Sequence, residues 1–238
     1  MQIQEIYHSH SGVDGYRRMT IYLKRRGYNY SAATIHKYMN TELCLRSVVR
    51  PKKPWIKSGK AHKVFENRLK QNFSADKPNQ KWCTDFTYLY LKNGDVRYNC
   101  TIIDLYDRSV VASITDRHIT SDLAIRTLQK ALESQPQVKG ERILHSDQGS
   151  QYTSKAFVEF CESAHIAQSM SKAGYPYDNA PMERYFNTLK NECTNLYEFR
   201  AEDDLYQTVE EFAYVTYNHL RPHSYNHYRT PFQARSSA

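Results

Sequence analysis

Cysteine is scarce in this chain and is not arranged in pairs. Its 238 residues include five cysteines, none in a C-x-x-C arrangement, which argues against a disulfide framework and a structural zinc site. No apolar run approaches the roughly 18 to 20 residues that a membrane span needs. The first residues lack the basic start and apolar core of a signal peptide. We therefore expect a cytoplasmic protein without a membrane partner.

Acidic residues are scarce only in the first third of the chain. Residues 1–81 contain 17 Lys or Arg and 5 Asp or Glu, a surplus of 12 positive charges, whereas residues 82–238 have a deficit of 4. The net charge of +8 therefore comes entirely from the first third. Such a concentration of positive charge indicates a polyanionic partner, and we expect this partner to be double-stranded DNA.

The densest basic stretch follows the first helices. Residues 46–70 contain nine Lys or Arg with Glu66 as the only acid, and prolines and a glycine interrupt any helix there. We interpret residues 46–78 as a basic linker that follows DNA phosphates, with Lys52 and Lys53 as candidate contacts. The alternative is a solubilising loop without a role in DNA binding.

Two short basic helices are predicted within residues 1–45. Residues 15–26 place apolar side chains on one helical face and basic side chains elsewhere, and a serine-capped helix follows over residues 31–40. The pair fits a helix-turn-helix module that binds DNA, with Arg17 and Arg18 as candidate contacts. Any small helical hairpin would have a similar pattern.

Residues 79–238 have the pattern of an α/β domain. Three strands, two of them joined by an Asn-Gly turn, are followed by strands that alternate with helices. The predicted strands are Trp82–Leu91, Arg97–Leu105, Ser109–Ile114, Arg142–Ser146 and Ile166–Met170. This order is that of a ribonuclease H-like mixed five-stranded sheet with flanking helices, although order alone does not exclude other α/β folds.

Three acidic residues stand where these elements would bring carboxylates together. Asp85 lies in the first strand on the face opposite Trp82, and Asp147 directly follows the fourth strand. Glu183 lies in a predicted helix that could deliver it to the strand ends, with 35 residues between it and Asp147. Each acid alone has an ordinary structural explanation, and Asp104 competes for the first position. Together, the three form a candidate catalytic and metal-binding triad.

Several stretches of the sequence resemble one known family. They are KWCTDFTYL around Asp85, IDLYDRSVV, HSDQGSQY around Asp147, SMSKAGYPYDNAPMERYFNTLKNE around Glu183, and YNHLRPHSYNHYRTP near the end. On these residues the chain is similar to the transposases of bacterial insertion sequences, whose catalytic domain is shared with retroviral integrases. It resembles the second-reading-frame product, and GYRRMTIYLKRRGYNYSAATIHKYM resembles the small helical module that precedes the catalytic domain.

The resemblance implies a polynucleotidyl transferase of the Asp-Asp-Glu (DDE) class. Such an enzyme hydrolyses a phosphodiester and then joins the freed 3′-hydroxyl to another strand. Asp85, Asp147 and Glu183 would be the catalytic residues and would hold two Mg²⁺ or Mn²⁺ ions, with Asp85 bridging both. The DNA would be the terminal inverted repeats of the element and a target. We also expect a homo-oligomer, and a first-frame DNA-binding protein as partner or fusion.

Residues near the triad are candidate DNA contacts. Lys190 stands two helical turns after Glu183, and Asn187 one turn after it, so all three share a helix face. We expect both residues and Arg184 to contact DNA phosphates, and Tyr177 to stack on a base. The family often has a small residue at the position of Arg184, which we interpret as a difference in DNA contact.

Other functions are compatible with parts of the sequence. A ribonuclease H-like nuclease that does not join strands would keep the acids but would have less need of the basic first third. A non-catalytic DNA-binding regulator would not need an intact triad. A His-x-His or tyrosine nickase has little support, because Ser9 separates His8 from His10 and no tyrosine lies in a recognisable motif. For His145 we favour a positioning role over that of a general base.

Overall fold

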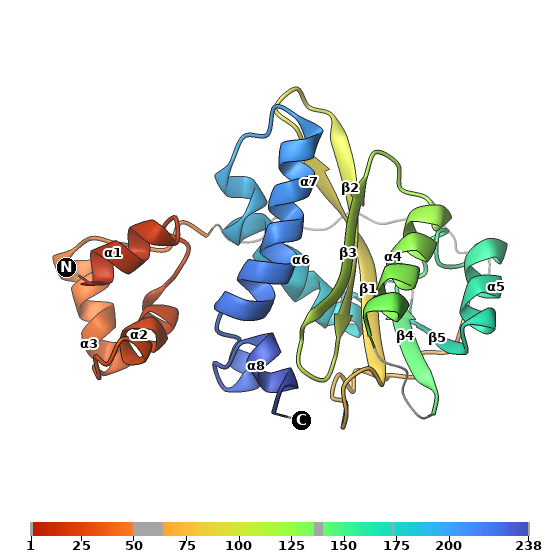
Figure 1. The fold of residues 1–238 in the computed structure, drawn as a ribbon, viewed down its shortest axis with the longest axis horizontal. Helices are drawn as coiled ribbons and strands as arrows, with labels where there is room; N and C mark the ends of the chain where they lie inside the picture. Colours follow the sequence, from red (N-terminus) through yellow and green to blue (C-terminus); the bar gives the residue numbers. More distant parts are fainter. Residues whose placement is uncertain (1, 50–63, 136–139, 173, 238) are drawn as a thin grey trace.

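A mixed five-stranded sheet forms the centre of the protein (Figure 1). The computed structural model describes residues 2–49, 64–135, 140–172 and 174–237. The strands are β1 (Lys81–Tyr90), β2 (Val96–Asp104), β3 (Val110–Asp116), β4 (Arg142–Ser146) and β5 (Ile166–Met170). They lie in the order β3-β2-β1-β4-β5, with β1, β2 and β3 antiparallel and β4 parallel to both of its neighbours. The predicted fold class, a ribonuclease H-like α/β sheet, is confirmed.

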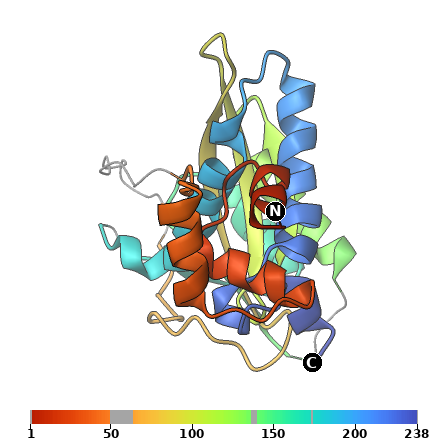
Figure 2. The ribbon, with the colours of Figure 1, turned by 90° about the vertical axis from the view of Figure 1, so that its left-hand side faces the viewer.

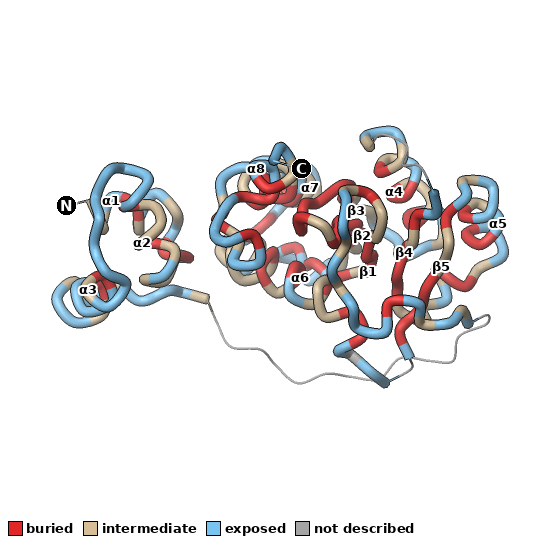
Figure 3. Tube along the Cα trace, turned by 90° about the horizontal axis from the view of Figure 1, so that it is seen from below, coloured by how far each residue is buried: buried red, intermediate tan, exposed pale blue. Residues whose placement is uncertain are grey.

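Helices cover both faces of the sheet. They are α4 (Ser121–Ser134), α5 (Lys155–Ser163), α6 (Ala180–Glu192), α7 (Glu202–Glu211), its π-helical continuation η4 (Phe212–Leu220) and α8 (Pro231–Arg235), with short turns η2 (Pro176–Asn179), η3 (Thr194–Leu196) and η5 (Ser224–Asn226). One hydrophobic core lies between the sheet and α4 and α5, and another between the sheet and α6, α7 and η4 (Figure 3). No helix in the described part of the chain is long and apolar enough to cross a membrane.

The first helices form an N-terminal module with its own hydrophobic core. They are α1 (Gln2–Ser9), α2 (Tyr16–Arg25), α3 (Ala32–Lys37) and the π-helical turn η1 (Tyr38–Glu42). Their core consists of Ile6, Met19, Leu23, Ile35 and Met39. Two perpendicular views place the module beside α6, α7 and α8, away from α4 and α5 (Figures 1 and 2). Helix α1 was not predicted, although Ile3, Ile6 and Tyr7 have the i, i+3, i+4 spacing of one helix face and pack in or against the module's core.

Local signals determine most element boundaries. Ser31, Thr120 and Ser154 each accept a hydrogen bond from the backbone N–H three residues along, and so cap α3, α4 and α5. Strands β4 and β5 begin and end at the predicted residues. At the start of α6, the side chain of Asn179 does not cap the helix. It bonds to β1 instead.

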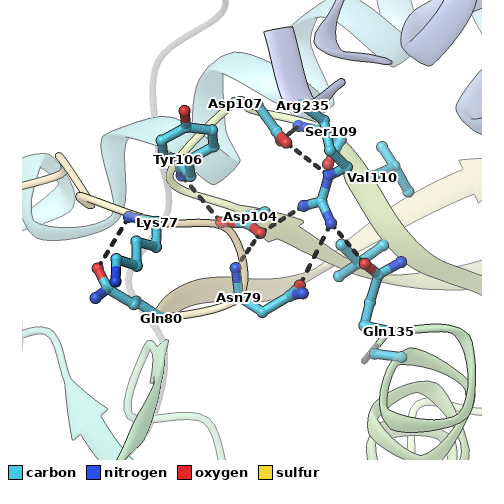
Figure 4. A network of polar contacts seen from close by, with 12 residues as sticks. Lys77, Asn79, Gln80, Asp104, Tyr106, Asp107, Ser109, Val110, Gln135 and Arg235 are labelled. Carbon is cyan, nitrogen blue, oxygen red and sulfur yellow. Dashed lines mark hydrogen bonds and ion pairs between the residues drawn. The ribbon is translucent and has the colours of Figure 1, made fainter. Parts of the chain in front are cut away.

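One arginine fixes the C-terminal helix to the sheet (Figure 4). Arg235 donates to the carboxylates of Asp107, at 2.6 Å, and Asp104, and also to the Gln135 side chain. Both aspartates are completely buried. Asp104 also accepts the backbone N–H of Asn79 at 2.7 Å. Asp104, the competitor for the first catalytic position, therefore has a structural role.

Candidate active site

Asp85 lies in the middle of β1, on the sheet face that α6 covers. Side chains alternate along a strand, so Asp85 points to the same side as Cys83, which packs in the α6 core. Trp82 packs in the opposite core, as the sequence predicts. The half-buried Asp85 accepts the backbone N–H of Phe86 at 2.7 Å. Its carboxylate is therefore held at the border between the sheet and α6.

Asp147 lies directly after β4, the strand that pairs with β1 in parallel. The register pairs Cys83 of β1 with His145 of β4, so two residues further along Asp85 stands level with Asp147. Strand β4 ends at Ser146, whereas β1 continues, and the chain leaves the sheet at Asp147. Because adjacent strands lie about 4.8 Å apart, the two aspartates are neighbours at one edge of the paired region.

The loop after β4 is built around the Asp147 carboxylate. Gly149 donates its N–H to Asp147 Oδ1 at 2.9 Å. A β-carbon on Gly149 would lie 2.9 Å from the same oxygen and 3.0 Å from Gln151 Oε1, so these two side chains would have to shift to make room for it. Glycine therefore allows the backbone to approach this carboxylate, which explains the small residue after the strand.

Helix α6 brings Glu183 to the two aspartates. Asn179 Nδ2 donates to the carbonyl of Thr84 at 3.2 Å and so anchors the start of the helix beside Asp85. Burial raises the pKa of Asp85, and the negative charges of Asp147 and Glu183 raise it further, whereas the Phe86 N–H lowers it. Burial also raises the pKa of Asp147. The carboxylate of Asp85 thus experiences the charge of both other acids.

This cluster of acids fits a divalent cation. It offers only oxygen ligands, which Mg²⁺ prefers. The charges of Asp147 and Glu183 raise the pKa of Asp85, which indicates an excess of negative charge that a cation would neutralise. The buried Oδ1 of Asn179 has no hydrogen-bond partner among the described residues. Among the described residues, no three His, Cys, Asp or Glu side chains lie close enough together to hold a metal ion.

Among the candidate DNA contacts, Lys190 is the residue that the structure brings to the acids. It is half-buried, which lowers its pKa, while the charge of Asp85 opposes this shift. Asn187 is also half-buried, and its side-chain oxygen accepts a hydrogen bond from Asn191 at 2.9 Å. Arg184 is exposed, and Tyr177 in the preceding turn is 72% exposed. Both can reach a DNA strand in solvent.

The basic residues singled out nearer the N-terminus differ in their surroundings. Arg17 is exposed on α2, open to a DNA phosphate. Arg18 faces the catalytic core instead and donates to both oxygens of Glu192, at 2.7 and 2.6 Å. The guanidinium of Arg18 is therefore bound to the carboxylate of Glu192. Lys52 and Lys53 lie outside the described residues.

His145 has the surroundings of a positioning residue. It is completely buried, and its ring nitrogens lie 2.8 Å from Ser169 Oγ and 3.1 Å from Ser171 Oγ. Burial lowers its pKa to about 4. The neutral ring holds the end of β4 against β5 and so supports the backbone that carries Asp147.

We expect the free energy of unfolding to decrease as the pH falls from 6.5 to about 4. The unfolded chain protonates this histidine near pH 6.5, whereas folded His145 resists protonation down to about pH 4. Acidification across this window should favour the unfolded state by about 3 kcal/mol. Urea denaturation above and within the window measures the effect. His145→Gln should show a smaller loss, and an equal loss in both proteins would contradict this role.

Sequence reasoning missed two residues that connect the site to its surroundings. Asn179 has a residue type that usually shapes turns and caps, but it stands one helical turn before Glu183, a spacing that indicates a shared helix face. Glu192 was not singled out. Its partners, Arg18 and Arg221, are 174 and 29 residues away, and no local pattern reveals such pairs.

Comparisons with known proteins agree with this arrangement. Family models described as Integrase core domain match residues 75–176 and 164–231, and a model described as HTH-like domain matches residues 1–53. A chain of a simian T-cell lymphotropic virus intasome structure has a TM-score of 0.58 at 18% identity, covering 100% of this chain and 75% of that one. The HTLV-2 integrase catalytic core domain in complex with magnesium has a TM-score of 0.51 at 21% identity, covering 68% of this chain and 99% of that one. These two likenesses show the fold.

Curated relatives define the family. Putative transposase InsK of insertion sequence element IS150, from Escherichia coli K12, is 34% identical over 221 residues, covering 92% of this chain and 76% of its own. Transposase InsF of IS3A, from the same organism, is 32% identical over 211 residues, covering 89% and 73%. Fold and family together define a polynucleotidyl transferase of the transposase and integrase class. The chain belongs to the insertion-sequence transposases and is a DDE transposase with an N-terminal helix-turn-helix-like module.

Proposed function

We propose that this transposase uses Mg²⁺ or Mn²⁺ to cut DNA at the ends of its insertion sequence and to join the freed 3′-hydroxyls to target DNA. One observation carries the proposal: Asp85 on β1 stands level with Asp147, which directly follows the neighbouring parallel strand β4, and the charges of Asp147 and Glu183 both raise the pKa of Asp85. Phosphoryl transfer demands little covalent chemistry from a protein, so positioned oxygen ligands and phosphate contacts suffice.

The three acids would share one role in this scheme. Asp85, Asp147 and Glu183 would hold the divalent ions through their carboxylate oxygens. When bound, such ions activate the attacking oxygen and stabilise the leaving oxygen. Gly149 orients the Asp147 carboxylate through its N–H, and its lack of a side chain leaves the space that the Asp147 and Gln151 side chains occupy. His145 keeps the strand end beneath it in place.

Basic and aromatic residues would hold the DNA. Lys190 would contact a phosphate beside the acids, and its half-buried ammonium would offset part of their charge. Asn187 and Arg184 would bind neighbouring phosphates. Tyr177 would stack on a base at the end of the element, and Arg17 would contact DNA from the N-terminal module.

We further propose that three regions of the chain have separate roles. Residues 1–45 would form the DNA-binding module, residues 46–78 the basic linker, and residues 79–238 the catalytic core. Lys52 and Lys53 of the linker would follow the phosphates of the terminal inverted repeat. Two DNA ends must be paired, so we expect a homo-oligomer, and a first-frame DNA-binding protein as partner or fusion. Its DNA substrate places its action in the bacterial cytoplasm, at the nucleoid.

Strand joining of a labelled oligonucleotide that carries the element's own end tests this function. With Mg²⁺ or Mn²⁺, we expect both a shortened strand and products longer than the substrate. Chelation with EDTA should abolish both, and added metal should restore them. An oligonucleotide with a scrambled end is the matched control and should give neither product at a comparable rate.

The same assay separates the alternative functions. Shortened strands without longer products would indicate a nuclease that does not join DNA. End binding without either product, at every metal concentration, would indicate a regulator. Product formation that is equal in EDTA and in Mg²⁺ would exclude the proposed role of the three acids.

A further inference from the structure

One face of helix α2 is directed at the catalytic core. Arg18, Tyr22 and Arg25 share this face, because they are spaced by four and three residues along the helix. Arg18 binds the carboxylate of Glu192 on α6, and Arg25 donates to two backbone carbonyls of the core at 3.5 and 3.3 Å. Tyr22 lies between these two arginines on the same helix face, and burial raises the pKa of its hydroxyl group. The adjacent face of α2 supplies Met19 and Leu23 to the module's own core, and Tyr22 packs against this core as well.

Glu192 is held by two arginines from distant parts of the chain. Arg18 donates to its two oxygens at 2.7 and 2.6 Å, and Arg221 donates to them at 2.7 and 2.9 Å. The Glu192 side chain is only 8% exposed. Burial opposes its ionisation, but Arg221 and Arg18 outweigh burial and lower its pKa. The Arg18–Glu192–Arg221 cluster is therefore a fixed, doubly bidentate ionic contact.

This contact lies on the helix that carries the catalytic glutamate. Glu192 stands nine residues after Glu183, which is 2.5 helical turns, so the two side chains leave α6 on opposite sides. Along the axis they are about 13 Å apart. Helix α6 thus presents Glu183 to the aspartates on one side and Glu192 to the N-terminal module on the other.

Polar contacts dominate the junction between the module and the core. The hydrophobic core of the module shares no residue with the core around α6. A cavity of about 500 Å³ opens beside the ionic cluster, lined by His10 and its neighbours from the module and by Glu192, Tyr197 and Phe212 from the catalytic core. The position of the module therefore depends on a few directed hydrogen bonds rather than on an extended apolar interface. Its own hydrophobic core allows the module to stay folded when these bonds are broken.

We propose that Arg18 and Glu192 are positioning residues that fix the DNA-recognition module against the back of the catalytic helix. Arg18 then acts as an internal contact rather than as a DNA contact. His36 and Lys37 on α3 are exposed and remain available for DNA. A DNA end bound by the module would consequently enter the active site of the same chain in a fixed register. This proposal deepens the proposed function and rests on it.

Arg18→Gln tests the proposal with little risk to folding. Arg18 also binds the buried Asp14 of its own module at 2.8 Å. In this variant Glu192 still has Arg221, and Asp14 still has His10 at 2.7 Å. We expect the affinity for the element's end to stay close to that of the wild type, because no DNA contact is removed. The cleavage rate at saturating DNA should fall by about ten- to a hundredfold, because the DNA end is misplaced. Arg18→Lys keeps the charge without the bidentate geometry and should recover part of this rate.

Lys24→Gln is the matched control, since it removes one positive charge from an exposed position of the same helix. Its rate at saturating DNA should equal that of the wild type. If Arg18→Gln weakens DNA binding and keeps the wild-type rate at saturation, Arg18 is a DNA contact and the proposal is wrong. A faster reaction in Arg18→Gln would also overturn it, because the contact would then be inhibitory.

Small-angle scattering of the DNA-free protein provides a readout that does not require activity. We expect Arg18→Gln to have a larger radius of gyration than the wild type, because the module leaves the core. A wild type without strand joining, but with this difference in scattering, would refute the proposed function and leave the docking contact intact. Identical scattering of the two proteins would refute the docking contact itself.

Discussion

Replacing Glu183 with glutamine is expected to leave a folded transposase that binds its DNA end but neither cuts nor joins it. Glutamine keeps the size of the side chain and removes the negative charge that a divalent cation requires. The rates of both steps should fall by about 10³-fold or more, because removing one member of a catalytic unit disables the whole unit. Single-turnover assays with Mg²⁺ measure both rates.

The stability of this variant provides an independent check. Glu183 raises the pKa of Asp85 through charge repulsion, so its neutralisation should leave the free energy of unfolding unchanged or increased. Glu162→Gln, at an exposed position of α5, makes the same chemical change away from the site and should keep full activity. Wild-type rates in Glu183→Gln would remove Glu183 from the active site. A large loss of stability would show that the residue is structural.

Arg235→Gln is expected to destabilise the protein more than any other single change discussed above. Arg235 is the cation that binds both Asp104 and Asp107, and these carboxylates are completely buried. Burial and the charge of Asp107 already raise the pKa of Asp104 despite the arginine. Removing the arginine leaves uncompensated buried charge, which costs about 3–5 kcal/mol. Urea denaturation of the two proteins measures the difference.

Two further variants identify the cause of this loss. Arg235→Lys keeps the charge but cannot bind both carboxylates through a planar fork, so its stability should lie between those of the wild type and Arg235→Gln. Arg229→Gln changes an exposed arginine of the same C-terminal region and should shift the free energy of unfolding by less than about 0.5 kcal/mol. Equal stabilities of Arg235→Gln and Arg229→Gln would show that the network in Figure 4 contributes nothing.

Local sequence signals predict the sheet well, including the strands beside which Asp85 and Asp147 lie. Strands β4 and β5 have their predicted limits because each is a short apolar segment with a polar boundary. Period-two alternation places Asp85 on the correct face of β1, and the end of β4 places Asp147 beside it. These features depend on neighbouring residues, so a single sequence reveals them.

Contacts between distant parts of the chain are not predictable in this way. Arg18 has the composition and helix position of a DNA contact, yet its partner Glu192 is 174 residues away. Arg235 and Asp104 are separated by 131 residues, and nothing near either residue indicates the pair. Asn179 favours a helix cap by residue type, but tertiary packing brings β1 within reach of its amide. Each of these pairings arises only once the helices have packed on the sheet.

The most direct test of the central claim is to locate Mn²⁺ by anomalous scattering in crystals of the transposase bound to its DNA end. We predict manganese density in contact with the carboxylates of Asp85 and Asp147, with Glu183 as a further ligand. Asp85→Asn crystals grown in the same way should lose this density. Manganese bound elsewhere, in crystals that still cut the DNA, would contradict the assignment of the active site.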